Sequence, residues 1–147
     1  MLDRSSEASD PDMLCHQRGT IYSFEDLLPR VAFIRSKKQE YLLCFSLDGA
    51  GCLIKRRVVT IGLINTTLAH PREVFSGPLA DRATSVIIVH NHPSGILVPS
   101  KADISSTQQL VSAGIVLGIP VRDHIIINKT DYYSFRQNTL IWDEEDL

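Results

Sequence analysis

The sequence lacks the marks of several protein classes. Its three cysteines include no Cys-x-x-C pair, and their odd number argues against both a disulfide framework and a cysteine zinc finger. Its apolar runs are far shorter than a membrane span, and the N-terminus has no apolar segment of a signal peptide. We therefore expect a soluble protein of the reducing cytoplasm, with no membrane partner.

Motifs for nucleotides and nucleic acids are missing as well. The net charge of −2, from 15 basic and 17 acidic residues, provides no general attraction for nucleic acid. The sequence has no glycine-rich phosphate loop, and it lacks the His-x-Glu and Pro-Cys-x-x-Cys motifs of a zinc-dependent nucleobase deaminase. What remains is an ordinary composition, 44% hydrophobic and 22% charged over 147 residues, which suits one compact domain.

The chain divides into three parts by composition. Residues 1–22 are rich in polar residues and are expected to form a flexible arm, and residues 141–147 form an acidic tail. Residues 23–140 are expected to form a single α/β domain, a mixed sheet with helices packed on it. Within this domain we expect helices over 23–34, from 70 onward and over 101–117, and strands over 41–47, 52–60, 61–68, 85–90, 121–127 and 132–135.

One segment, HNHPSGILVPSKAD from His90 to Asp103, concentrates the residues of a metal site. His90 and His92 lie two apart at the end of an apolar strand, so both imidazoles face the same side of the sheet. Pro93 and Gly95 then end the strand, and a short loop can return Asp103 to the two histidines. Two imidazoles and a carboxylate leave a fourth position for water, which suits catalytic zinc and also resembles the facial triad of non-heme iron.

Hydrolysis at such a site also needs a general base and a group that stabilises the oxyanion. Glu40, immediately before the strand 41–47, is the preferred base. Glu73 is the rival, although its place near the start of a Pro-opened helix already has a structural explanation. Ser100 could donate a hydrogen bond to the oxyanion. A simpler interpretation also exists, because Ser100 and Asp103 form a helix capping box that needs no metal.

Two neighbouring features have simpler explanations. His124 lies in the alternating run 121–127 and is predicted to be a structural histidine with satisfied hydrogen bonds, not a ligand. The apolar stretch from Gly95 to Val98 is predicted to pack inward, although it could also contact a substrate or a partner chain.

The whole pattern resembles the JAMM signature of metallopeptidases, in which an upstream Glu precedes His-x-His, seven residues and Ser-x-x-Asp. Residues 93–99 supply the seven. The stretches HPREVF, HNHPSG, PSKADI and DHIII are similar to the RadC branch of this family, and the resemblance covers roughly residues 23–135. It implies a JAB/MPN-like (cytidine-deaminase-like) fold, with a mixed β-sheet flanked by helices, around one Zn²⁺.

By residue, the resemblance implies that His90, His92 and Asp103 are the metal ligands, Glu40 the catalytic glutamate and Ser100 the oxyanion donor. These residues imply a zinc-dependent hydrolase that cleaves a peptide or isopeptide amide bond in an unidentified peptide or protein. The alternative is a non-catalytic module that binds DNA repair or replication complexes. We favour the enzyme because degenerate JAMM domains lose ligands, whereas here the set is intact.

DNA binding receives less support from the resemblance. Full-length RadC-type proteins carry an N-terminal helix-hairpin-helix region that is associated with DNA binding. Residues 1–22 are too few to hold this region, so we expect it to be absent and any DNA association to be weaker. The sequence leaves a homo-oligomer open.

Overall fold

The computed structural model describes residues 19–62, 69–139 and 141–142. In this part of the chain, five strands form one sheet in the order β2-β1-β3-β4-β5. The strands are β1 (Tyr41–Leu47), β2 (Leu53–Ile61), β3 (Ser85–Asn91), β4 (Val121–Ile127) and β5 (Tyr132–Ser134). The helices are α3 (Phe24–Val31), the 3₁₀ helix η1 (Ala32–Ile34), α4 (Pro71–Ala80), α5 (Lys101–Leu117) and α6 (Phe135–Asn138).

The sheet is mixed, as the sequence predicted. β1 pairs antiparallel with β2 and with β3, and β4 pairs antiparallel with β5. β3 and β4 are parallel, and α5 connects them. A parallel pair needs such a crossover, because the chain must return to the end of the sheet at which β3 begins. The carboxyl end of β3 and the start of α5 are thereby joined by one short loop.

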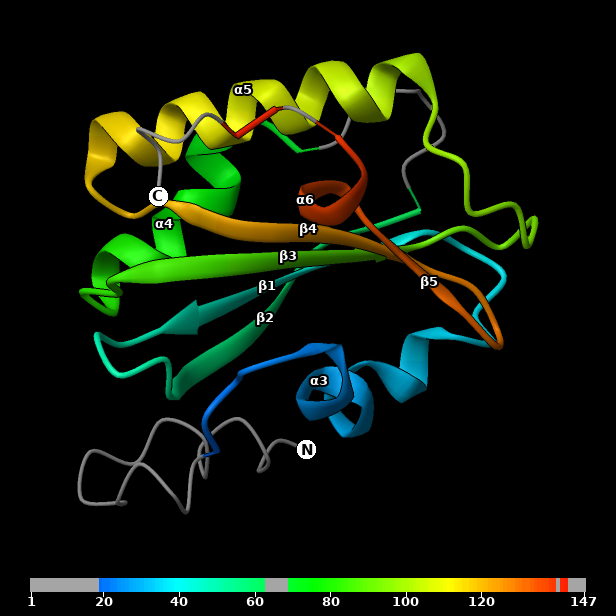
Figure 1. Ribbon diagram of the computed structural model, residues 1–147, viewed down its shortest axis with the longest axis horizontal. Coiled ribbons are helices and arrows are strands. Elements are labelled where there is room, and N and C mark those ends of the chain that lie inside the picture. The colour runs from blue at the N-terminus through cyan, green and yellow to red at the C-terminus, as the bar shows by residue number, and fades with distance from the viewer. Residues whose placement is uncertain (1–18, 63–68, 140, 143–147) are drawn as a thin grey trace.

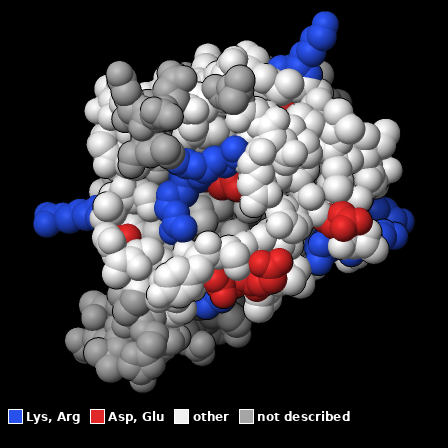
Figure 2. Space-filling model, viewed as in Figure 1, with Lys and Arg blue, Asp and Glu red and all other residues white. Residues whose placement is uncertain are grey.

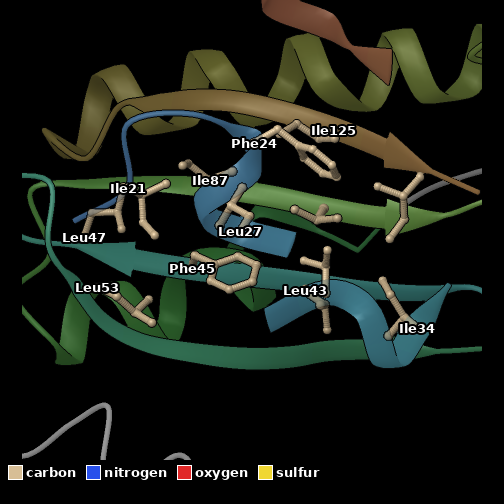
Figure 3. Close-up of a cluster of buried hydrophobic side chains, with 13 residues drawn as sticks. Ile21, Phe24, Leu27, Ile34, Leu43, Phe45, Leu47, Leu53, Ile87 and Ile125 are labelled. Carbon is tan, nitrogen blue, oxygen red and sulfur yellow. The ribbon is translucent and has the colours of Figure 1, made fainter. Parts of the chain in front are cut away.

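Helices cover both faces of the sheet (Figure 1), with α3 on one side and α4 and α5 on the other. Alternate side chains of β1 and β3 point to opposite faces. Leu43, Phe45 and Ile87 pack against α3, as Figure 3 shows, whereas Cys44 and Ile88 pack against α4 and α5. Both strands are therefore buried on two faces, which explains their nearly continuous apolar sequences.

α5 has well-defined ends, and these ends fix its position beside the sheet. Ser100 and Asp103 form a capping box at its start, and Gly118 ends it in the left-handed conformation with φ 72°. Gly114 allows the following loop to approach closely, because a Cβ there would lie 2.6 Å from the Ile119 carbonyl oxygen. The first turn of α5 therefore sits at the carboxyl end of β3.

Some expectations differ from the structure. The helix predicted over 23–34 contains Pro29 without breaking, but it ends at Val31 and continues as η1. The short helix α6 was not predicted; the Ser134 hydroxyl caps it by accepting from the Gln137 N–H at 3.2 Å. Most of the strand expected over 61–68 lies outside the described residues, as do most of the arm over 1–22 and of the tail over 141–147.

The cysteines are also not all as expected. Cys44 is free and buried in β1, as a small core residue would be. Cys52 is disulfide-bonded, a bond that the odd number of cysteines argued against. Its sulfur also lies 3.5 Å from the Thr20 hydroxyl.

Candidate metal centre

The carboxyl end of β3 places His90 and His92 side by side. His90 lies within the strand and pairs with Leu42 of β1 and Ile126 of β4. His92 follows the strand, and its backbone N–H donates to the Ile127 carbonyl at 2.9 Å, which continues the pairing with β4. The Nε2 atoms of the two imidazoles lie 3.0 Å apart. The two-residue spacing thus brings both rings to one point.

Asp103 approaches the histidines from the first turn of α5. Its Oδ2 accepts from the Ser100 backbone N–H at 2.9 Å, and the Ser100 hydroxyl accepts from the Asp103 N–H at 3.0 Å. Asp103 Oδ1 lies 3.7 Å from His90 Nε2, and Oδ2 lies 3.2 Å from His92 Nε2. The capping box and the contact with the histidines therefore coexist, because the cap aims the carboxylate at both rings.

Glu40 reaches the same point from the neighbouring strand. It directly precedes β1, whose antiparallel register pairs Leu42 with His90, so the next step of the register brings Glu40 beside His92. The Asn91 side chain holds the backbone around Glu40 in place, because it accepts from the Tyr41 N–H at 2.6 Å and donates to the Gln39 carbonyl at 3.0 Å. Among the described residues, Glu40 and the two histidines form a group whose ligand atoms all lie within 4.8 Å of one another.

The two other candidate residues lie in exposed positions. Glu73 is exposed in the first turn of α4 and is not part of this group. Ser100 is exposed beside Asp103. In the helix cap its Oγ acts as an acceptor, which leaves the hydroxyl proton for another partner.

Behind His90, two buried side chains complete a chain of hydrogen bonds. His90 Nδ1 lies 2.7 Å from His124 Nε2, and His124 Nδ1 lies 2.6 Å from Thr107 Oγ1. The Thr107 hydroxyl donates to the Asp103 carbonyl at 2.6 Å. The prediction of a structural histidine with satisfied hydrogen bonds is confirmed for His124. Sequence reasoning missed Thr107, although its place one helical turn after Asp103 could have indicated it.

Burial and neighbouring charges set the protonation of the cluster. Burial lowers the pKa of His90 to about 3, so its imidazole is neutral at pH 7. Burial raises the pKa of Asp103, but hydrogen bonds from His92 and the Ser100 N–H outweigh it and bring the pKa well below its usual range. Burial lowers the pKa of His92, but its hydrogen bond with Asp103 and the neighbouring negative charges raise the pKa by more, so the net shift is upward. Burial also raises the pKa of Glu40, which the charge of His92 offsets in part.

The loop after His92 is held by polar contacts, and the side chains of Ile96 and Val98 are exposed, whereas Leu97 is partly buried. His92 Nδ1 lies 2.7 Å from the Ile96 carbonyl oxygen, and the Asn128 side chain donates to the Gly95 carbonyl at 2.9 Å. Ile96 is 63% exposed and Val98 71% exposed. The prediction that this stretch packs inward is therefore wrong, because the loop is anchored through its backbone and needs no apolar contact to stay in place.

A cavity of about 500 Å³ lies on the opposite face of the sheet, between α3 and β4. Phe24, Arg122, Asp123 and Arg136 contribute to its lining. Figure 2, which views the molecule with α5 above the sheet and α3 below it, shows a hollow bordered by basic side chains, with an acidic group beside them. The histidine cluster lies under α5 on the other face, so this cavity is separate from the candidate metal centre.

Comparison with known proteins agrees with this architecture. The family model described as RadC-like JAB domain matches residues 21–140. A UPF0758 protein of Picosynechococcus is 47% identical over 105 residues, which cover 71% of this chain and 43% of the relative. Another from Methanococcoides burtonii is 41% identical over 132 residues, 90% of this chain and 56% of the relative.

The chain spans about half the length of the curated relatives that it matches. In the described residues, no helix has the length and apolar character that a membrane crossing requires. The mixed sheet with flanking helices, the histidine cluster and the match over most of the sequence agree with one another. The chain belongs to the RadC-like JAB domain family.

Proposed function

We propose that this chain is a zinc-dependent hydrolase that cleaves a peptide or isopeptide amide bond. In this proposal His90, His92 and Asp103 hold the metal, Glu40 is the general base and Ser100 stabilises the oxyanion. Membership of the JAB domain family supports the class of reaction, while the names of the relatives specify no activity. The observation that carries the proposal is the convergence of two imidazole nitrogens and one carboxylate at one point.

The hydrogen-bond partners show why this point suits a cation. The Ile96 carbonyl can only accept, so His92 Nδ1 carries a proton. His92 Nε2 faces Asp103 Oδ2 at 3.2 Å, and it would offer its lone pair to a metal by giving up the proton of that contact. The buried chain behind His90 ends on the Asp103 carbonyl, so its protons point away from the site as well. Two imidazole lone pairs and one carboxylate then face each other, and a divalent metal is the partner that such a set binds.

The distances support a single tetrahedral ion. Zinc bonds of about 2.0–2.1 Å to nitrogen or oxygen separate neighbouring ligand atoms by about 3.3–3.4 Å. The separations here are 3.0 Å between the two histidines, 3.7 Å from His90 to Asp103 and 3.2 Å from His92 to Asp103. Three protein ligands leave a fourth position for water, which is the arrangement of catalytic zinc sites.

Zinc in such a site supplies a Lewis acid and a water molecule with a pKa of about 7. Glu40 would take a proton from the attacking water as its oxygen bonds to the carbonyl carbon. The raised pKa of Glu40 suits a base that must later release this proton to the leaving nitrogen as the C–N bond breaks. Ser100 would donate its free hydroxyl proton to the developing oxyanion, an interaction typically worth about 2.7–4 kcal/mol.

The test is cleavage of a peptide library by the protein with zinc and with a chelator. We expect zinc-dependent cleavage by the parent, and we expect Glu40→Gln to bind zinc as the parent does but to lose cleavage. Glu73→Gln is the matched control and should cleave normally. Loss of cleavage in Glu73→Gln alone would reassign the base. A parent that binds zinc and partner proteins but shows no turnover would indicate the binding module instead.

A further inference from the structure

The chain of hydrogen bonds behind His90 has one consistent direction. The Asp103 carbonyl can only accept, so the single proton of the Thr107 hydroxyl is used there. Thr107 Oγ1 must therefore accept from His124 Nδ1–H. The His124 side chain is fully buried, and its two ring nitrogens contact Thr107 and His90, neither of which is an acid, so burial favours the neutral ring. Its Nε2 then holds a lone pair and accepts from His90 Nδ1–H. His90 Nε2 is thereby left as a lone pair that faces the candidate metal centre.

These hydrogen bonds also join two of the candidate ligands to each other. They begin at the imidazole of His90 on β3 and end at the backbone of Asp103 on α5. His124 bridges the gap from β4, where it pairs with Ile88, and its ring stacks on Phe135 with centroids 4.7 Å apart and planes inclined by 15°. The stacking fixes the plane of the bridging imidazole, so both of its nitrogens keep their alignment.

We infer that His124 and Thr107 are positioning residues that hold His90 in the tautomer with Nε2 free for the metal and fix its ring relative to Asp103. This inference rests on the proposed zinc site. A histidine ligand in a metal site usually donates its other N–H to a carboxylate, a carbonyl or water. Here the acceptor is a neutral imidazole, so the tautomer is fixed without a second negative charge in the buried layer.

Thr107→Val should reverse the donor-to-acceptor direction of these hydrogen bonds. The variant has nearly the shape of the parent but removes the acceptor for His124 Nδ1–H. His124 is then free to move its proton to Nε2 and donate it to His90 Nδ1, because a buried donor without an acceptor is costly. The proton of His90 would then lie on Nε2 and point into the metal centre. We expect the zinc affinity to fall by about 10–100-fold, the typical effect of losing such a partner.

Two comparison variants separate this effect from general destabilisation. Thr107→Ser keeps the hydroxyl and should bind zinc nearly as the parent does. Thr139→Val is the matched control, because Thr139 also donates to the carbonyl four residues earlier, that of Phe135, at 2.6 Å. Its hydroxyl accepts from the Ile141 N–H and not from a histidine. Should Thr107→Val fail to fold, His124→Gln and His124→Phe form a second pair, in which only Gln offers an acceptor to His90.

The experiment combines ¹⁵N NMR of the histidine rings in the metal-free protein with zinc titration against a competing chelator. We expect the His90 proton on Nδ1 in the parent and its transfer, with weaker zinc binding, in Thr107→Val. A His90 proton on Nε2 in the parent, or parent-like zinc affinity in Thr107→Val and His124→Phe, would overturn the inference. A parent that binds no zinc would instead remove the proposed function, and the NMR measurement would still decide the direction of the chain.

Discussion

Zinc should stabilise the folded protein by an amount that follows from where its ligands lie. His90 and His92 come from the end of β3 and Asp103 from the start of α5, and the fold brings them to within 3.0–3.7 Å. An unfolded chain has no such preformed site, so binding free energy adds to folding free energy. At a free zinc concentration 100 times the dissociation constant, the gain is about 2.7 kcal/mol. For a domain of this size, that corresponds to a rise in Tm of about 5–11 °C.

Differential scanning calorimetry with zinc and with a chelator measures this shift. Asp103→Asn is the sharpest variant, because Asn can still accept from the Ser100 N–H and cap α5 but lacks the charge that zinc requires. We expect the variant to lose most of the zinc-dependent rise. An equal rise in Asp103→Asn and in the parent would place zinc elsewhere, and the absence of any rise in the parent would refute the reasoning.

Three further predictions concern single groups. Ser100→Ala removes the cap of α5 and should lower the free energy of unfolding, measured in urea, by about 1 kcal/mol. With a cleavable peptide, the same variant should also lower kcat by about 10²–10³-fold. Ser100→Thr should retain the cap. Burial raises the pKa of Cys44 to about 12, whereas an unfolded thiol ionises near pH 8.5, so stability should fall by about 1.4 kcal/mol per pH unit above about 8.5. Cys44→Ala should lack this part of the slope in urea unfolding at pH 8 and pH 10, and an identical slope would contradict the assignment. Arg57 Nη2 of β2 donates to Asp81 Oδ1 at the end of α4 at 2.7 Å, in a part-buried ion pair. Asp81→Asn breaks this pair and should lower the free energy of unfolding by about 1–2 kcal/mol. Unchanged unfolding in urea would show that the pair contributes nothing.

The main elements of the fold could be predicted from local sequence patterns. The apolar runs of β1 and β3 and the capping box of α5 carry strong signals, and the structure contains all three. The short helix α6 gave no such signal, because four residues are too few to show a helical period. The exposure of Ile96 and Val98 could not be predicted from the sequence either, since polar contacts from distant residues hold their loop in place.

The candidate site shows a similar division. Spacing alone indicated that His90 and His92 share a face, and the structure places their Nε2 atoms 3.0 Å apart. It could not decide between a capping box and a ligand at Asp103. The structure shows that the carboxylate that caps α5 also lies 3.2 Å from His92 Nε2, and its role as a ligand stays a prediction. The contact between His124 and His90 depends on which strands are neighbours in the sheet, and no local pattern in the sequence records that order.

The most direct test of the metal centre is a crystal structure of the protein with zinc, with the ion located by its anomalous scattering. We predict one peak at about 2.0–2.2 Å from His90 Nε2, from His92 Nε2 and from one carboxylate oxygen of Asp103, with water in the fourth position. A peak away from these three residues would contradict the account. A fourth protein ligand that closes the site, such as Glu40, would make the metal structural and would contradict it equally.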